Sequence, residues 1–210
     1  MKRLLDLCLS LLLLIFLAPV LLLIGIIIKI DSRGPVLFCQ KRVGYKRKVF
    51  TCYKFRTMKS ETPDIATNDF EDREDYMTGI GHYLRKYSLD ELPQLLNIIR
   101  GNMSIVGPRP VIPDEEKLVQ KRAEQGIYDI KPGVTGWAQI NGRDHVSVSE
   151  KVDYDLYYLE NHSLWMDLKI ILRTVTYVLK KKGVIEHTGG RKAKQTTVQK
   201  QSVHSHKKSS

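Results

Sequence analysis

Two adjacent carboxylates, Asp90 and Glu91, stand at the centre of the segment SLDELPQL, residues 88–95. Pro93 is tolerated in the first turn of a helix, where its missing N–H would have no partner. The sequence therefore predicts a helix that begins close to Asp90 and ends at Gly101. At such a helix start, the unpaired N–H groups and the positive dipole end stabilise negative charge, and they can also hold a phosphate.

The same residues fit a purely structural role. Ser88 and Glu91 have the spacing of a capping box, S-x-x-E, and acidic residues are ordinary in a first helical turn. Taken alone, this segment favours capping over catalysis. The choice between the two depends on what the rest of the chain places around the two carboxylates.

Length, charge and cysteine content limit the number of domains and the kinds of stabilising site that the chain can have. The 210 residues allow one domain with a hydrophobic core plus appendages, and the formal net charge is +11. Nine basic residues against one acid give residues 31–60 a net charge of +8, whereas residues 61–75 hold seven acids and one base. The three cysteines are too few and too scattered for a disulfide framework or a zinc site, which fits a reducing cytosol.

The N-terminal part of the chain is apolar. Residues 7–28 contain no charged residue, which is long enough for a membrane-spanning helix. A cleaved signal peptide fits poorly, because the apolar run continues for nine residues beyond Pro19. Both flanks are basic, which favours two cytoplasmic ends, and Pro19 deletes a hydrogen bond near the middle. A straight span and a re-entrant helix both remain open. Asp6 needs a partner beside this run, and Arg3 is its candidate.

A basic β-hairpin is predicted after the apolar run. Residues 36–40 and 49–55 are rich in β-prone side chains, and Gly44 lies in the basic turn between them. Most of these basic residues suit an anionic lipid surface. Lys54 and Arg56 differ, because they alternate with aromatic residues in one strand and could point toward a site.

Further charged residues stand where the sequence predicts rigid presentation. A short helix over residues 79–87 carries Arg85 toward Ser88. Arg109 lies between two prolines, which stiffen the backbone around a guanidinium suited to a phosphate or carboxylate clamp. Asn141-Gly142 is a turn that exposes Arg143. Asp155 lies on the apolar face of a helix that begins with a capping box at residues 147–150, and such a carboxylate must be paired or functional.

We divide the chain into an N-terminal membrane helix (residues 1–33), a cytosolic catalytic domain (34–186) and a basic tail (187–210). The tail holds six Lys or Arg residues and no acid, without apolar periodicity, which predicts disorder. Residues 163–182 are strongly amphipathic and end in three lysines, which suits a membrane surface. The predicted fold class is α+β and mainly helical, with a small basic hairpin and amphipathic interfacial helices around an Asp-Glu site.

Together these segments resemble the bacterial sugar transferases, small monotopic phosphoglycosyl transferases that begin capsule, exopolysaccharide and glycoconjugate assembly. The resemblance runs from Lys2 to about Gly183. It rests on motifs in the family's order: Lys2-Arg3-x-x-Asp6, Tyr53–Met58, Ser88–Leu95, Gly107–Pro110, Pro132–Gln139 and Asn141–Arg143. Each motif is weak alone, and the ordered set is specific. Residues 62–67 are similar to the Gram-positive capsule branch, which implies an N-acetylated hexose or 6-deoxyhexose donor.

The resemblance implies transfer of a sugar 1-phosphate from a UDP-sugar to undecaprenyl phosphate, with release of UMP. In the family, the aspartate of the Asp-Glu pair is the nucleophile and Mg²⁺ is required. This implies a covalent aspartyl-phosphosugar at Asp90, with Glu91 as the second catalytic residue and the metal ligand. The implied substrate- and phosphate-binding residues are Lys54, Arg56, Arg85, Arg109, Thr135, Gln139, Arg143 and Asp155.

The resemblance also implies a monotopic protein on the cytoplasmic face of the bacterial cell membrane. Family members have a re-entrant helix broken at a Ser-Pro pair, which here is Ala18-Pro19. The expected partners are the UDP-sugar, undecaprenyl phosphate and membrane lipid, with no nucleic acid and no indication of oligomeric state. Two other functions remain open: a membrane-tethered inverting glycosyltransferase that releases UDP, and a non-enzymatic basic protein bound to a membrane surface.

Overall fold

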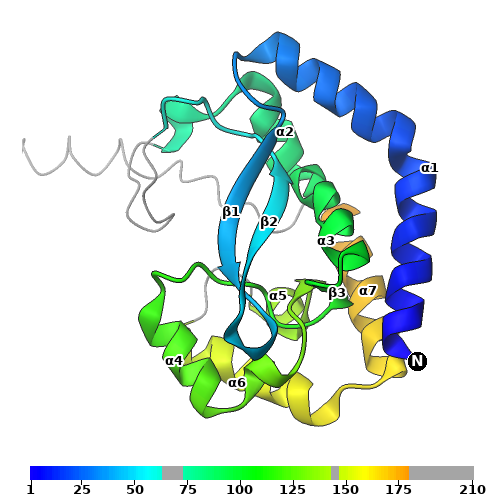
Figure 1. Ribbon diagram of the computed structural model, residues 1–210, viewed down its shortest axis with the longest axis vertical. Helices are drawn as coiled ribbons and strands as arrows, with labels where there is room; N and C mark the ends of the chain where they lie inside the picture. The colour runs from blue at the N-terminus through cyan, green and yellow to red at the C-terminus, as the bar shows by residue number, and fades with distance from the viewer. Residues whose placement is uncertain (63–72, 143–146, 180–210) are drawn as a thin grey trace, which may run out of the picture.

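The computed structural model describes residues 1–62, 73–142 and 147–179, which form a mainly helical fold with two small sheets (Figure 1). The α-helices are α1 (Lys2–Asp31), α2 (Gly79–Lys86), α3 (Leu95–Ile99), α4 (Glu116–Glu124), α5 (Trp137–Asn141), α6 (Val148–Asn161) and α7 (Leu164–Leu179). The strands are β1 (Leu37–Val43), β2 (Val49–Phe55), β3 (Ser104–Val106) and β4 (Gly133–Thr135). The 3₁₀ helices are η1 (Tyr45–Arg47), η3 (Arg73–Tyr76), η4 (Leu89–Gln94) and η5 (Ile127–Asp129).

The predicted hairpin is confirmed. β1 and β2 pair antiparallel from Leu37 opposite Phe55 to Val43 opposite Val49, with η1 in the turn. Directly opposed residues point to the same face, and side chains alternate between faces along a strand. Because Gln40 is paired with Cys52, and Lys54 lies two residues further along β2, one face of the hairpin carries both Gln40 and Lys54.

The segment around Asp90 differs from the prediction. The chain forms the 3₁₀ helix η4 and then one short α-helix, α3, instead of one α-helix from Asp90 to Gly101. Ser88 has a left-handed backbone, with φ of 55°, and its side chain caps nothing. The capping-box interpretation of Ser88 and Glu91 is therefore wrong, because the Glu91 carboxylate is held by two cations described below and does not reach back to Ser88.

A parallel strand pair that the sequence did not predict lies behind the Pro108-Arg109-Pro110 segment. β3 and β4 pair Ser104 with Gly133 and Val106 with Thr135. The backbones come so close here that a Cβ on Gly133 would lie 2.1 Å from the amide nitrogen of Gly107. Glycine is needed at this position because only its missing side chain allows that approach.

α1 is one uninterrupted helix of 30 residues with Pro19 inside it. The predicted break at Pro19 is therefore not present as an unwound segment. Figure 1 instead shows α1 changing direction along its length and arching over one side of the molecule, as expected when an internal proline removes one hydrogen bond. The helix is long and apolar enough to cross a membrane by length and composition, with a mean hydropathy of 3.3 in its most apolar window.

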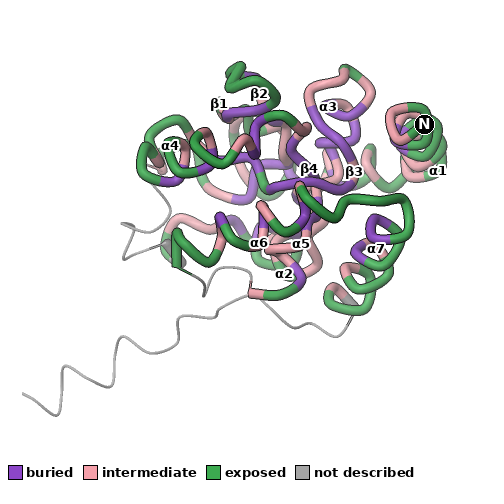
Figure 2. Tube along the Cα trace, turned by 90° about the horizontal axis from the view of Figure 1, so that it is seen from below, coloured by how far each residue is buried: buried purple, intermediate pink, exposed green. Residues whose placement is uncertain are grey.

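The inner face of α1 packs against the rest of the chain along its whole length. Its buried residues are Asp6, Ser10, Ile24 and Ile28, and Leu13, Leu14 and Leu21 pack in the same direction. Asp6, Ser10 and Leu14 are four residues apart, and Leu21, Ile24 and Ile28 follow at steps of three and four two turns further on, which is the spacing of one helix face. The outer face exposes large apolar side chains (Figure 2).

Asp6 is held by β3, and the predicted pairing with Arg3 is wrong. Ser104 Oγ donates to Asp6 Oδ2 at 2.8 Å, and the Ile105 amide donates to Oδ1 at 3.2 Å. Arg3 donates instead to the Ile98 carbonyl at 2.6 Å, at the C-terminal end of α3. A guanidinium is well placed there, because the last carbonyls of a helix lack partners within it.

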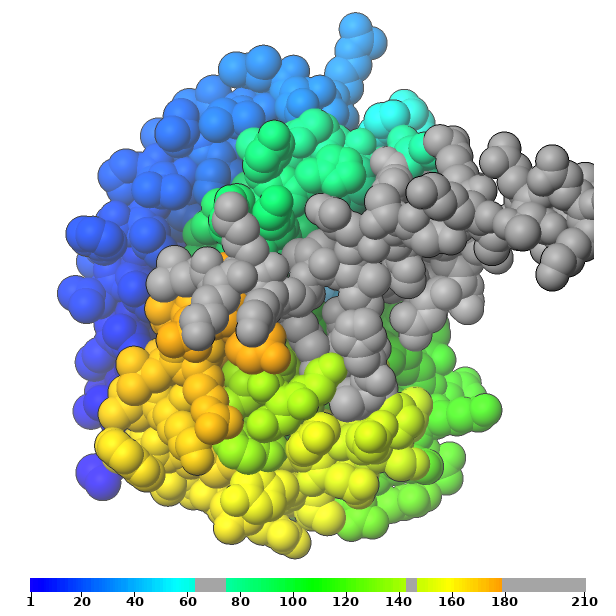
Figure 3. Space-filling model, turned by 180° about the vertical axis from the view of Figure 1, so that it is seen from behind, coloured from blue at the N-terminus to red at the C-terminus, as the bar shows by residue number. Residues whose placement is uncertain are grey.

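The C-terminal helices close the fold. The capping box predicted at the start of α6 is confirmed, with Ser147 and Glu150 as reciprocal partners. α7 buries Met166 and Ile170 against the rest of the chain, and its exposed large apolar residues are Leu164, Trp165, Leu168, Leu172, Val175 and Tyr177. Figure 3 shows α7 beside the N-terminal part of α1. The two helices are joined where Lys2 Nζ meets Asp167 Oδ2 at 2.5 Å.

Candidate active site

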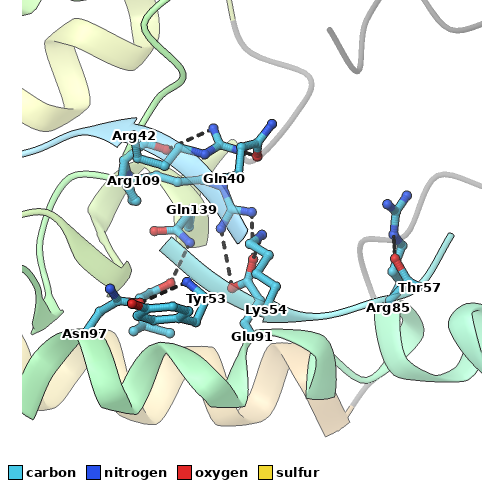
Figure 4. Close-up of polar contacts among 12 residues, drawn as sticks. Gln40, Arg42, Tyr53, Lys54, Thr57, Arg85, Glu91, Asn97, Arg109 and Gln139 are labelled. Atoms are coloured by element: carbon cyan, nitrogen blue, oxygen red, sulfur yellow. Dashed lines mark hydrogen bonds and ion pairs between the residues drawn. The ribbon is translucent and has the colours of Figure 1, made fainter. Parts of the chain in front are cut away.

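Glu91 lies at the centre of the candidate active site (Figure 4). Lys54 Nζ donates to Glu91 Oε1 at 2.8 Å, and Arg109 Nη2 donates to the same oxygen at 2.7 Å. The second oxygen, Oε2, has a long contact of 3.5 Å with Arg109 Nη1. The three side chains come from β2, from η4 and from the segment after β3, so the fold brings together residues from three separate parts of the sequence.

The charge of Glu91 is stabilised by its partners. Burial of the side chain disfavours the carboxylate, but the positive charges of Arg109 and Lys54 outweigh this effect, so the pKa of Glu91 lies well below its usual range. Glu91 is therefore ionised at neutral pH. It neutralises two cations that would otherwise face each other in a partly desolvated space.

Asp90 is in a different environment from Glu91, although the two are adjacent. It is 9% exposed, and no side chain of the described residues donates a hydrogen bond to its carboxylate. Burial and the neighbouring charge of Glu91 raise the pKa of Asp90, while Lys54, Arg85 and Arg109 limit that rise. A carboxylate that is desolvated and not engaged by a donor keeps its lone pairs available for reaction.

The backbone that presents Arg109 is held at four successive carbonyls. Pro108 O accepts from the Gly133 amide at 2.9 Å, and Val111 O accepts from the Val43 amide at 2.9 Å. Between them, Arg109 O accepts from Arg122 Nη1 at 2.7 Å, and Pro110 O accepts from Arg42 Nη1 at 3.3 Å. The two prolines already restrict the backbone, so these contacts fix the direction in which the Arg109 side chain leaves it.

Asp155 acts on this segment through Arg122, a residue that the sequence analysis did not single out. Arg122 Nη2 meets Asp155 Oδ2 at 2.5 Å, and the two side chains are only 4% and 2% exposed. The helix pattern predicted that Asp155 needs a partner, but α4 and α6 are 33 positions apart at this contact, and no local signal named Arg122. In the structure, Asp155 is therefore connected to Arg109 through Arg122, which holds the Arg109 carbonyl.

The structure places the other predicted residues in several ways. Arg85 Nε donates to Thr57 Oγ1 at 3.0 Å, and its charge acts on Asp90. Arg56 is buried and donates to the carbonyls of Ser32 and Arg33, both at 2.7 Å, so it closes the end of α1 and does not join Glu91. β2 ends at Phe55, so the alternation of side chains along the strand, from which we expected Arg56 to point the same way as Lys54, stops before Arg56.

The two candidates from the β4–α5 segment face inward. Thr135 Oγ1 is 2.6 Å from Thr174 Oγ1 on α7, so it packs this segment against α7. Gln139 Nε2 donates to the Val134 carbonyl at 3.0 Å, and Gln139 Oε1 is buried without a partner among the described residues. Arg143 lies outside the described residues.

Whether Mg²⁺ fits this site depends on the oxygen ligands that the described residues offer. The described residues contain no group of three or more His, Cys, Asp or Glu side chains that could enclose a metal ion. Mg²⁺ commonly binds only one or two carboxylates together with substrate phosphates. Asp90 and Glu91 are adjacent, and Glu91 Oε2 has no donor closer than 3.5 Å among the described residues. These residues fit an ion that arrives with a phosphate substrate, and they do not fit a site made of protein ligands alone.

The known proteins to which this chain is similar include sugar transferases and sugar phosphotransferases. The chain is 44% identical over 185 residues to an undecaprenyl-phosphate glucose phosphotransferase of Komagataeibacter xylinus, and 43% identical over 185 residues to EpsL, an uncharacterized sugar transferase of Bacillus subtilis. It is 40% identical over 182 residues to a UDP-glucose:undecaprenyl-phosphate glucose-1-phosphate transferase of Escherichia coli. These matches cover 83%, 88% and 83% of this chain.

The relatives differ in length. The matched region spans 35% of the Komagataeibacter protein and 39% of the E. coli protein, but 90% of the B. subtilis protein. The bacterial sugar transferase family profile matches residues 1–181, which include α1, the hairpin and all the candidate residues. The chain therefore belongs to the bacterial sugar transferase family.

Proposed function

We propose that this protein transfers a sugar 1-phosphate from a UDP-sugar to undecaprenyl phosphate and releases UMP, as an early membrane step of capsule, exopolysaccharide or glycoconjugate assembly. The proposal rests on the different environments of two adjacent carboxylates. Glu91 is engaged by two cations, whereas Asp90 is buried and accepts no hydrogen bond from the described side chains. A capping pair would not be divided in this way.

In the proposed first step, an Asp90 carboxylate oxygen attacks the β-phosphorus of the UDP-sugar. A bond forms between this oxygen and phosphorus, and the bond from phosphorus to the bridging oxygen breaks, so that UMP leaves with that oxygen. In the second step, a phosphate oxygen of undecaprenyl phosphate attacks the aspartyl-phosphosugar. The Asp90 carboxylate is released, and the lipid carries a diphosphate-linked sugar.

The cations around Asp90 oppose the repulsion between its carboxylate and the phosphates. Lys54, Arg85 and Arg109 all act on Asp90, and they limit the rise in its pKa that burial and the charge of Glu91 cause. Arg109 is held rigidly through its backbone, so it can orient a phosphate with little loss of conformational freedom. Lys54 and Arg109 contact Glu91 before substrate arrives, and both side chains are cationic donors of the kind that phosphate oxygens accept.

A magnesium ion belongs to this proposal as a cofactor bound with the donor. Glu91 would hold it through Oε2, and Asp90 lies on the adjacent residue. When bound, Mg²⁺ supplies neutralisation of phosphate charge.

We place both ends of α1 on the cytoplasmic side. At its start, Lys2 contacts Asp167, and at its end Asp31 Oδ2 accepts from the Ile80 amide at 3.3 Å. A helix of 30 residues is roughly 45 Å long, which exceeds the roughly 30 Å thickness of the hydrocarbon core. Because both ends are tied to the same soluble part of the chain, a bent helix that enters and leaves on one side fits these contacts better than a straight span.

The first prediction tests the nucleophile. Asp90→Asn keeps the shape of the side chain but removes its nucleophilic oxygen, so it should abolish UMP release both with and without undecaprenyl phosphate. Wild-type protein given a UDP-sugar and Mg²⁺ alone should release at most about one UMP per site and should gain a sugar phosphate on the peptide that contains Asp90. A panel of UDP-glucose, UDP-galactose and UDP-N-acetyl sugars identifies the donor.

The exposed Asp129, changed to Asn, is the matched control and should leave turnover unchanged. Substantial turnover by Asp90→Asn, or a label on another residue, would contradict the covalent route. Release of UDP in place of UMP would instead identify an inverting glycosyltransferase, and no nucleotide release would support the non-enzymatic alternative.

The second prediction concerns the metal. Glu91→Gln preserves shape and removes charge, so the Mg²⁺ concentration for half-maximal UMP release should rise several-fold and the maximal rate should fall. Glu124→Gln, at an exposed position on α4, is the control. An unchanged Mg²⁺ requirement in Glu91→Gln would show that Glu91 does not hold the ion.

The third prediction concerns topology. In a cysteine-free background, a cysteine added before Lys2 and Ser32→Cys should both resist an impermeant maleimide in intact cells, and both should react after permeabilisation. Pro19→Ala should straighten α1 and expose one of the two sites. Labelling of either site in intact cells with Pro19 present would establish a spanning helix.

The fourth prediction separates support from stability. Asp155→Asn leaves the Arg122 charge buried without a counterion, which should cost roughly 3–5 kcal/mol and most of the activity. The double variant Arg122→Met with Asp155→Leu removes both charges, so its thermal stability should recover while UMP release stays low, because Arg109 O has lost its donor. Full turnover in the double variant would show that the pair only stabilises the fold.

A further inference from the structure

Arg42 is a cation beside the candidate active site, and it has no role in the reaction proposed above. It lies on β1 two residues after Gln40, so it shares the hairpin face that carries Gln40 and Lys54. In Figure 4 the Arg42 side chain lies next to that of Arg109, which reaches Glu91. Arg42 is half-buried.

The contacts of Arg42 leave its charge without a close counterion. Nη1 donates to the Pro110 carbonyl at 3.3 Å, and Nη2 donates to Gln40 Oε1. Both partners are neutral, and no carboxylate of the described residues forms an ion pair with Arg42. A guanidinium has five N–H donors, so these two contacts leave donors available in a fixed orientation.

The electrostatics around Arg42 favour an additional anion. Burial and the neighbouring charge of Arg109 lower the pKa of Arg42, while Glu115 and Glu91 act in the opposite direction from a distance. Among the described residues in these interactions, the four cations Lys54, Arg85, Arg109 and Arg42 stand against Asp90, Glu91 and Glu115, which is a formal net charge of +1. Like charges held together in a partly desolvated space are unfavourable unless an anion joins them.

A purely structural role accounts for less of this arrangement. The contact with the Pro110 carbonyl is long, and the neighbouring Val111 carbonyl is already held by the Val43 amide at 2.9 Å. The side chain of Gln40 orients the Arg42 guanidinium without neutralising it. Support of one carbonyl therefore does not require a charged group placed beside a second arginine.

We propose that Arg42 and Arg109 together bind a phosphate oxyanion of the substrate, with Gln40 as the residue that positions the Arg42 guanidinium. This inference rests on the proposed function for the identity of the phosphate. Guanidinium groups favour phosphate oxygens as acceptors, and Arg42 and Arg109 lie on neighbouring segments, so both can donate to one phosphate. The phosphate belongs either to the diphosphate of the nucleotide donor or to the lipid acceptor.

The test compares Arg42→Gln and Arg42→Lys with Lys41→Gln. Lys41 is adjacent in sequence but lies on the opposite face of β1, where it donates to Thr51 Oγ1. Binding of UDP with Mg²⁺, and separately of inorganic pyrophosphate, is measured by calorimetry and by the rise in melting temperature that each ligand causes. Each variant's ligand-free melting temperature is the baseline, which separates binding from stability.

For a donor phosphate, Arg42→Gln should weaken UDP and pyrophosphate binding by about tenfold or more, because a charge-assisted hydrogen bond is lost. Arg42→Lys should recover part of the affinity, Gln40→Ala should weaken it less than Arg42→Gln does, and Lys41→Gln should bind as wild type does. For an acceptor phosphate, UDP binding should stay unchanged while the KM for undecaprenyl phosphate rises about tenfold.

Unchanged ligand affinities and an unchanged acceptor KM in Arg42→Gln would overturn the proposal. A lower ligand-free melting temperature with an unchanged ligand-induced rise would also overturn it, since Arg42 would then only support the Pro110 segment. Failure of the proposed function has a different signature, because wild-type protein would release no UMP from any donor. In that case, weaker binding of pyrophosphate by Arg42→Gln than by wild type would still support an anion site at Arg42.

Discussion

The paired contacts of Lys54 and Arg109 with Glu91 are the constraint on which the site depends. A carboxylate that is largely shielded from water is stable only when cations and hydrogen bonds replace the water that it has lost. Because the two cations belong to β2 and to the segment after β3, satisfying Glu91 fixes three separate parts of the chain relative to one another. The environment of Asp90 results from the same arrangement. Asp90 is buried because it is next to Glu91 in the chain, and Lys54 and Arg109 donate to Glu91 instead of to Asp90.

A second set of contacts keeps these three parts rigid. Asn97, fully buried on α3, donates to the Thr51 carbonyl at 2.7 Å and accepts from the Tyr53 amide at 3.0 Å, so it anchors β2 to the helix that follows the carboxylates. Arg122 and Asp155 do the corresponding work for the Arg109 backbone. Two buried polar groups of opposite charge are costly to place in a core, and their retention makes sense where they hold a backbone segment that carries a reacting side chain.

The sequence predicted features that are encoded locally. The hairpin has β-prone runs around a glycine turn, α6 begins with a complete capping box, and α7 has a continuous apolar face. Each of these elements is specified by residues that are close to one another in the sequence. The capping interpretation of Ser88 failed because a long-range ion pair at Glu91 overrides a local hydrogen bond. β3 and β4 were missed because strands of three residues have no measurable alternation, and their glycines are explained only by a close approach between distant segments. Arg122 was missed for the same reason, since a residue on a polar helix acquires its role only when that helix packs against Asp155.

The apolar helix α1 is connected to the candidate active site through a short path of contacts. Asp6 on α1 holds the Ser104 hydroxyl and the Ile105 amide of β3, and β3 leads directly into Gly107 and the segment that presents Arg109. A carboxylate so close to an apolar helix would be expensive without these donors, so its position ties the helix and β3 together. If the acceptor is a phosphate on a lipid, that phosphate lies at the membrane surface, and the catalytic cations must be held at a fixed height above it. The Asp6 contacts provide that coupling, because they attach α1, which is long and apolar enough to cross a membrane, to the strand that precedes the Arg109 segment.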